Sequence, residues 1–487
     1  MQRRDGLKRG LLTCAIALSA ACSSVPERAA PELPPDWFAS APEGPVDAGL
    51  LVDWWKAFDD PQVSNVVERA MERNRDVRLA MLQAEAARSQ LRLSRAGLFP
   101  AIDATGSATR QWIGNDQDLP PGSPLAEFGL DDNLRIDIWE LALEASWEID
   151  LFGATRARID GARAQLRSAQ AEAVAARIAV ASAAAQAYIQ IRALQAQREL
   201  LREGIGVAEE LERIAGRLFD VGEVTRLDVE SAAAERASLQ ADLGELDISL
   251  TEALLMLDNL LAEPPGTLAT ELDAEVPVPL AASPITAGQP IDLLRRRPDL
   301  IAAVAQLEAS SQQSLAARRD LFPTLAVQAA AGRSGLRLNN DLSTASPFAR
   351  VAALFSLPLL DFGRRQTAID LADLEGDAAF IGMQQAIADA LLDVEQGLAA
   401  IEGQQRRHAA LSRARDHYQR AHELARTSYR LGEANLNDVL NAQRGELQAR
   451  QQYLAGRTAL ATAQVSLYVA LGGGWAPEQP VTAEARP

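Results

Sequence analysis

The sequence predicts a mixed α/β membrane protein, in which strands from several copies of the chain close a β-barrel and very long helices follow the strands. Three observations lead to this fold class. Residues 139–153 alternate between apolar and acidic side chains, residues 155–218 contain no proline, and the same order of elements occurs twice in the chain. Each observation constrains a different part of the architecture.

The clearest strand is WELALEASWEIDLFG at residues 139–153. Its odd positions are apolar as far as Ile149, and its even positions include four carboxylates, namely Glu140, Glu144, Glu148 and Asp150. A period of two indicates a strand with one apolar and one acidic face. Burying such a face in a soluble sandwich would be costly, whereas a membrane barrel turns it to a water-filled lumen, with aromatic residues such as Trp139 and Trp147 at its borders. An edge strand of a soluble sheet is the alternative.

The chain has 487 residues and a formal net charge of −18. This length predicts several layers or an extended architecture, and the acidic balance argues against a nucleic-acid-binding protein. Both cysteines, Cys14 and Cys22, lie near the N-terminus, where a basic start and a short apolar core predict a signal peptide at 1–21. The segment resembles a bacterial lipobox, which implies a covalent lipid on Cys22. Leu18 lies one position further from Cys22 than that pattern prefers, and simple cleavage is the alternative.

The rest of the first half reads in order as arm, helix, strand, loop, strand and two helices. Residues 22–62 form a proline-rich arm with an equatorial segment, and helical spacing runs from Val63 to Leu98. A weak strand at 101–112 and a loop precede the acidic strand. The proline-free stretch would be about 95 Å long as one helix. It is rich in alanine and interrupted by polar residues, so we expect a closely packed helix and not a membrane span. A proline-rich linker occupies 263–296.

An internal repeat sets the domain organisation. Residues 74–100 align without gaps on 297–323, and the later motifs align at a smaller offset, so the first hairpin loop is expected to be longer than the second, at Gly332 to Pro347. The sequence predicts a first repeat at 63–262 with a β-hairpin at 99–151, a second repeat at 297–472 with a β-hairpin at 322–361, and a C-terminal tail at 473–487. Four strands cannot close a barrel, and open edges cannot face lipid. Three copies supply twelve strands, within the known range.

The ordered motifs of the chain resemble those of the TolC-like outer membrane factor family, most closely its NodT-type lipoprotein branch. The motifs are WWKAFDDP at 54–61, ERNRDVRLA at 72–80, SWEIDLFG at 146–153, LLRRRPDL at 293–300, LDFGRR at 360–365, GEVTRLDV at 222–229 and GEANLNDV at 432–439. The resemblance implies a homotrimer with a twelve-stranded outer-membrane barrel, a long α-helical periplasmic barrel and a mixed equatorial belt.

The resemblance also implies a function. The trimer would be the outer membrane channel of a tripartite efflux system, passively conducting small molecules from an inner-membrane RND-type pump and a periplasmic adaptor to the exterior. No cofactor is expected beyond the lipid on Cys22. The outer channel of a type I protein secretion system is the alternative.

The same resemblance implies that the two helical turns are periplasmic tips. Gly222, Glu223, Gly432 and Glu433 would dock the adaptor. Asp438 falls at a position that forms an aspartate ring in the family, although the second ring position is Asn441 here. Tyr429 and Asp228 fall at positions that pair across helices in a closed gate, while a basic partner of some relatives is Ala434. The alternative is that Asp228 and Asp438 are helix N-terminal caps.

An enzyme is the main competing class of protein. The chain has three histidines, His408, His417 and His422, which we expect on a helix surface. The last two are five residues apart, which does not match the spacing of a helical metal-binding pair. No nucleophile elbow, phosphate-binding loop or dinucleotide fingerprint occurs. The sequence therefore predicts neither catalytic residues nor a metal site.

Overall fold

The computed structural model describes residues 33–39, 48–113, 134–282, 284–338 and 342–476. The chain forms two compact units. The described residues of the first unit lie within 86–166 and 305–380, and those of the second unit lie within 29–85, 167–304 and 381–487. Both units therefore draw on both sequence repeats.

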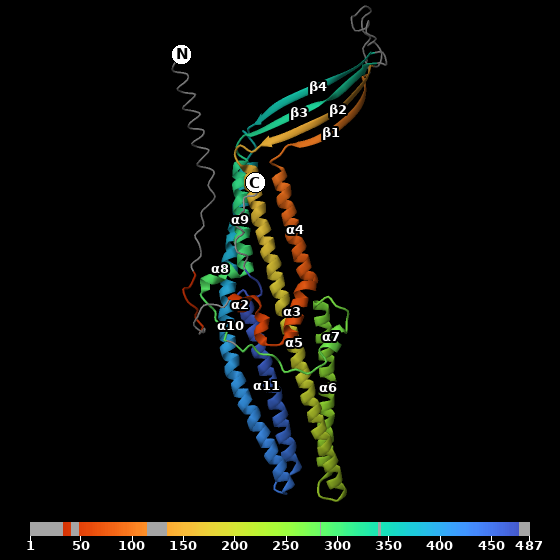
Figure 1. Ribbon diagram of the computed structural model, residues 1–487, viewed down its shortest axis with the longest axis vertical. Coiled ribbons are helices and arrows are strands. Elements are labelled where there is room, and N and C mark those ends of the chain that lie inside the picture. The colour runs from red at the N-terminus through yellow and green to blue at the C-terminus, as the bar shows by residue number, and fades with distance from the viewer. Residues whose placement is uncertain (1–32, 40–47, 114–133, 283, 339–341, 477–487) are drawn as a thin grey trace, which may run out of the picture. The chain divides into compact units, whose positions relative to one another are not determined.

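The first unit contains one antiparallel sheet in the order β1-β2-β3-β4, whose strands lie side by side (Figure 1). The strands are β1 (Ala101–Ile113), β2 (Leu134–Ile149), β3 (Thr324–Leu338) and β4 (Leu342–Ser356). Each repeat supplies one hairpin, and β2 pairs with β3 to join them. The predicted loop at Gly332 to Pro347 is wrong, because most of these residues pair in β3 and β4.

The second-repeat hairpin has loop-like composition, yet cross-strand packing holds it in the sheet. Arg333 lies opposite Pro347, which an edge strand tolerates since its amide side need not be paired. Gly335 lies opposite Trp139, and a Cβ at position 335 would come within 2.2 Å of the Trp139 Nε1 atom. The glycine therefore provides the space that the indole ring occupies.

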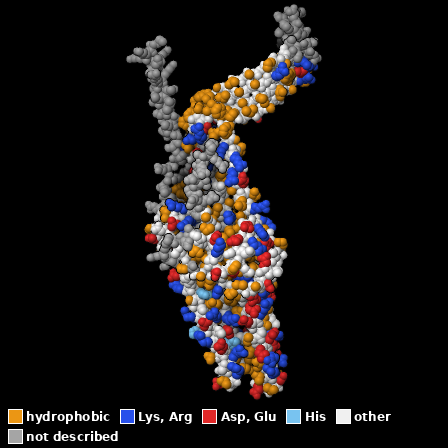
Figure 2. Space-filling model, viewed as in Figure 1, with side chains coloured by type: hydrophobic (Ala, Val, Ile, Leu, Met, Phe, Trp, Pro, Cys, Tyr) orange, Lys and Arg blue, Asp and Glu red, His pale blue; other side chains and the backbone are white. Residues whose placement is uncertain are grey.

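The two faces of the sheet differ as the alternation in β2 predicts. Trp139 is 41% exposed, Leu141 64% and Leu143 60%, and Val351 and Phe355 of β4 share this apolar face. Hydrophobic side chains cover much of the sheet surface seen in Figure 2. An exposed apolar face of this kind suits lipid, because water would penalise it.

One carboxylate of the predicted acidic face has a different role. Asp150 lies beyond the end of β2, and its carboxylate accepts hydrogen bonds from the amides of Thr155 and Arg156 at 3.1 and 3.0 Å. It therefore caps the following helix, α5 (Ala154–Asp220). Asp361 does the same for α10 (Arg364–Arg430), accepting from the Gly363 and Arg365 amides.

Glycine makes the turn from strand to helix in both repeats. Gly153 has φ +80° and Gly363 has φ +88°, values at which other residues are strained. Next to the first corner, the Phe152 ring stacks on Phe322 with centroids 4.9 Å apart. The recurring Phe-Gly pair thus marks the point where each strand gives way to a long helix.

The helix expected from Val63 to Leu98 is in fact two helices. α3 (Pro61–Arg73) ends at Asn74, and α4 (Arg75–Ala96) begins immediately after it. The Asn74 side-chain oxygen accepts from the Asp76 and Val77 amides, and its amide group donates to the Leu260 carbonyl at 2.9 Å. This buried side chain caps α4 and joins it to α6 (Arg226–Leu260).

The second repeat has its break at the equivalent position. α8 (Leu293–Arg296) is separated from α9 (Pro298–Arg319) by Arg297, which is extended because proline follows it. The Arg297 guanidinium donates to Asp299 and to Asp393 of α10, at 2.7 and 3.0 Å. The two repeats therefore reach the same kink through different residues.

The second unit is built from the lower parts of the long helices, together with α6 and α11 (Leu436–Ala470). α5 with α6 and α10 with α11 form two antiparallel hairpins (Figure 1). By length and composition α5 could cross a membrane, but 44% of its most apolar window is buried in the structure. Its alanines Ala181, Ala184 and Ala185 are fully buried, which is the close packing that the composition predicts.

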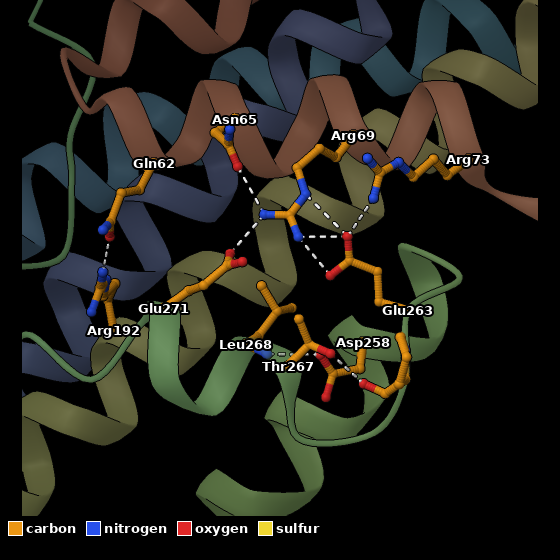
Figure 3. Close-up of polar contacts among 11 residues, drawn as sticks. Gln62, Asn65, Arg69, Arg73, Arg192, Asp258, Glu263, Thr267, Leu268 and Glu271 are labelled. Carbon is orange, nitrogen blue, oxygen red and sulfur yellow. Dashed lines mark hydrogen bonds and ion pairs between the residues drawn. The ribbon is translucent and has the colours of Figure 1, made fainter.

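The linker after α6 is held against the second unit by charged contacts. Arg69 of α3 donates to Glu263 through two nitrogens and to Glu271, in α7 (Thr267–Glu271), at 2.7 Å (Figure 3). Arg73 donates to the same Glu263 carboxylate, which is 6% exposed. The Asp258 carboxylate accepts from the Leu268 amide. Sequence reasoning treated this segment as a linker only and did not find these contacts.

Aromatic and cationic side chains fill the core beside the short elements α2 (Ala48–Val52), η1 (Trp54–Phe58) and η2 (Pro290–Asp292). The Trp54 ring is fully buried and stacks on Tyr468 of α11 with centroids 5.9 Å apart. The fully buried Arg192 donates to Gln62 (Figure 3) and to the Leu272 and Ala274 carbonyls. The Arg192 hydrogen bonds satisfy a charge that would otherwise be costly to bury.

Candidate functional site

The candidate site is the pair of turns that close the two helical hairpins. In the first, the Gly222 amide donates to the Phe219 carbonyl and the Glu223 amide to the Leu218 carbonyl. Gly432 and Glu433 repeat this pattern with the Tyr429 and Ser428 carbonyls. Both glycines have positive φ, +81° and +77°, which this helix ending requires. A Cβ atom added at either glycine would have no neighbour within 4 Å, so both turns present open surface.

Both predicted gate carboxylates lie in capping boxes. Thr225 and Asp228 cap α6, and Asn435 and Asp438 cap α11, each with reciprocal side-chain to amide hydrogen bonds. Such boxes satisfy amides that the first helical turn leaves unpaired. The capping interpretation therefore describes the local geometry of both residues, and it leaves the Asp438 side chain exposed to solvent.

Only one of the two carboxylates also bridges the hairpins. The Asp228 Oδ1 atom accepts a hydrogen bond from the Asn437 amide group of α11 at 3.2 Å. The Thr225 hydroxyl, the Thr225 amide and this contact together hold the pKa of Asp228 below its ordinary value. The Tyr429 hydroxyl, predicted to pair with Asp228, is buried and has no hydrogen-bond partner among the described residues. Burial and the nearby Asp228 charge raise the pKa of Tyr429.

A small apolar cluster joins the hairpins above this contact. Its buried members are Leu211 and Ala215 of α5, Ala232 of α6, and Leu436, Val439 and Leu440 of α11. Val229 and the Tyr429 ring pack against it. Because the cluster is small, the two hairpins are held near their tips by few contacts.

Sequence reasoning found the tip residues but missed one partner. Asn437 occupies the place in GEANLNDV that Leu227 takes in GEVTRLDV, and this difference between the repeats was the available signal. Asn441, Glu223 and Glu433 are exposed, as surface residues of the tips should be. Cys22, the predicted lipidation site, lies outside the described residues.

The expectation that all three histidines lie on a helix surface is wrong for His422. This side chain is 7% exposed, and its Nδ1 atom lies 2.5 Å from a carboxylate oxygen of Glu446 in α11. His408 also packs inward, with its ring stacked on Tyr453 at 4.9 Å. Helix pairing buries His422 and partly covers His408, which a single-helix pattern could not show.

Comparison with known proteins decides the family. The outer membrane efflux protein model matches residues 66–263 and 290–473. The chain belongs to this family. It is 30% identical over 472 residues to the pyoverdine export outer membrane protein OpmQ of Pseudomonas aeruginosa, covering 96% of this chain and 97% of that protein. It is also 30% identical to the toluene efflux pump outer membrane protein TtgC of Pseudomonas putida, covering 96% of both chains.

Solved structures agree with the fold. The outer-membrane channel OprN is 26% identical and superposes with a TM-score of 0.79, covering 93% of this chain and all of that chain. The Campylobacter jejuni CmeC outer membrane channel, at 23% identity and a TM-score of 0.81, shows the same fold, covering 94% of this chain and 96% of its own. The predicted fold class and the TolC-like resemblance are confirmed. The protein is an efflux channel of the outer membrane.

Proposed function

We propose that three copies of the chain form the outer-membrane duct of a tripartite efflux system, through which small molecules leave passively. The observation that carries this proposal is the four-stranded sheet, which along Trp139 to Ile149 of β2 has one exposed apolar face and one acidic face. Towards the Arg110–Asp137 pair, the apolar face ends in charged side chains. The free edges of the sheet cannot face lipid unless they are paired. Three copies pair every edge and turn the charged face to a water-filled bore.

An inner-membrane RND-type pump and a periplasmic adaptor complete the proposed system. The names of the relatives support efflux over type I protein secretion, since they refer to export of pyoverdine and toluene. We also propose that the mature chain carries a lipid on Cys22. We assign adaptor docking to the two turns at Gly222–Glu223 and Gly432–Glu433, because both are exposed and free of neighbouring atoms. A duct of this kind requires no catalytic residue and no cofactor.

The tips form the proposed gate. In a trimer, three exposed Asp438 carboxylates would surround the axis at the tip, where like charges repel unless cations lie between them. The ring would then bind divalent cations and block the duct. Asn441 contributes no charge, so the ring is single.

Planar bilayer recordings of the purified protein test this function. We expect ion conductance that divalent cations block from the tip side, and Asp438→Ala should weaken that block because three carboxylates are lost. Asn441→Ala is the matched control, since it shortens an exposed side chain of the same helix without changing charge. A block that is unchanged in Asp438→Ala would remove the ring from the mechanism, and a purified trimer that conducts no ions would contradict the duct itself.

A further inference from the structure

The charged face of the sheet carries one row of side chains that crosses all four strands. Asp103 of β1 lies opposite Glu144 of β2, which lies opposite Ala330 of β3, which lies opposite Arg350 of β4. Residues in register across antiparallel strands project from the same face. Glu140 lies four positions before Glu144, and therefore on this face too.

Arg350 reaches across the neighbouring strand to both glutamates. Its Nη2 atom lies 3.0 Å from a carboxylate oxygen of Glu144 and 3.4 Å from one of Glu140. To do so, the side chain passes over β3, where Ala330 offers only a methyl group. Ala330 is 8% exposed and Ala142, between the two glutamates, is 4% exposed, although most of the sheet is open. The Arg350 guanidinium also lies over the Phe348 ring, with its central carbon 5.2 Å from the ring centroid.

These contacts have little effect on stability but a large effect on charge. The side chain of Arg350 is 59% exposed, and ion pairs this open to water contribute little to folding. Among the described strand residues, this face holds four carboxylates, namely Asp103, Glu140, Glu144 and Glu148, and the single guanidinium of Arg350. The net charge of the face is therefore −3 per chain. Without Arg350 it would be −4.

We infer that Arg350 sets the ion selectivity of the barrel, by partly neutralising an acidic wall that otherwise attracts cations and repels anions. The inference rests on the proposed function, since it requires this face to line a bore. Because three copies contribute, one substitution removes three positive charges from the wall. Arg333 provides a matched control: it lies opposite Leu141, on the apolar face, so its loss changes the charge of the chain equally but not the charge of the bore.

The test is the ratio of potassium to chloride permeability of the full-length trimer, obtained from reversal potentials in a salt gradient. Arg350→Gln should raise the ratio about twofold at about 0.1 M salt, where charges act over roughly 10 Å, and much less at 1 M. The double variant Glu140→Gln with Glu144→Gln should lower it. Arg333→Gln should leave it unchanged.

A second readout does not depend on whether the tip is open. In a Cys14→Ser, Cys22→Ser background, Ser334→Cys places a single thiol opposite Glu140, within the barrel. Adding Arg350→Gln should raise the rate of its reaction with a cationic methanethiosulfonate relative to an anionic one. Equal ratios with and without Arg350, in either assay, would overturn the inference while leaving the duct intact. A trimer that conducts no ions and whose thiol cannot be reached from water would overturn the proposed function as well.

Discussion

The contact between Asp228 and Asn437 allows a sharp prediction about the tips. It is the one hydrogen bond between α6 and α11 in which a predicted gate residue takes part in the described structure. Asp228→Ala removes both this bond and the α6 capping box, whereas Thr225→Ala removes the side-chain cap and keeps the carboxylate. Asn437→Ala removes the bond and keeps the whole box. The three variants therefore separate helix capping from hairpin bridging.

The magnitude follows from the surroundings of the bond. Its acceptor is charged, but Asn437 is exposed and Asp228 only half-buried, so we assign about 0.7 kcal/mol per chain, at the low end for hydrogen bonds. If the three tips of a trimer move together, the bonds sum to about 2 kcal/mol, about a thirtyfold change in the ratio of closed to open tips. The capping box is worth about 1 kcal/mol to α6, and that cost is shared by Asp228→Ala and Thr225→Ala.

Resting conductance in planar bilayers measures the open fraction directly. Asp228→Ala and Asn437→Ala should raise it similarly, and Thr225→Ala should change it little. A pH dependence is expected for the stability of the start of α6: since hydrogen bonds, chiefly from Thr225, lower the pKa of folded Asp228, the contribution of this carboxylate to stability is complete above the unfolded pKa and is lost as the pH falls through the folded pKa. Equal conductance in Asn437→Ala and the unaltered protein would refute the reasoning.

Two further predictions concern the linker and the turns. Glu263→Gln should lower the free energy of unfolding by about 2 kcal/mol, because it leaves Arg69 and Arg73 without their shared, nearly buried carboxylate. Glu271→Gln, at a 47% exposed carboxylate, should lower it by under about 1 kcal/mol. Equal losses for the two variants in chemical denaturation would contradict this prediction. Inserting a bulky tripeptide after Glu223 and after Glu433 should reduce efflux by cells without altering trimer yield, and normal efflux would argue against adaptor docking there.

Much of the candidate site could be predicted because the tips repeat. GEVTRLDV and GEANLNDV each contain a turn glycine followed by a capping pair, so local rules locate both turns and both boxes. The Asn437 bond and the cluster around Val439 lie between segments about 210 residues apart in the chain. No periodicity in either segment specifies which side of one hairpin meets the other.

The same distinction applies to buried polar groups. His422 has the spacing of an exposed helical residue, yet α11 covers it and supplies Glu446. The break at Arg297 was readable from Pro298, because proline excludes the preceding residue from the helix. The equivalent break at Asn74 could not be predicted in this way, since asparagine interrupts a helix only where its side chain has a hydrogen-bond partner, here the Leu260 carbonyl.

The sequence by itself determined the alternation of β2, the long proline-free helices, the glycine corners and the twofold repeat, and with them the fold class. These features depend on near neighbours in the chain, whose spacing follows directly from backbone geometry. Only the tertiary structure decided that Asp150 caps a helix, that Arg350 spans three strands to two glutamates, and that Arg69 holds the linker. Such contacts depend on which distant segments meet, and that is settled by the packing of the whole chain.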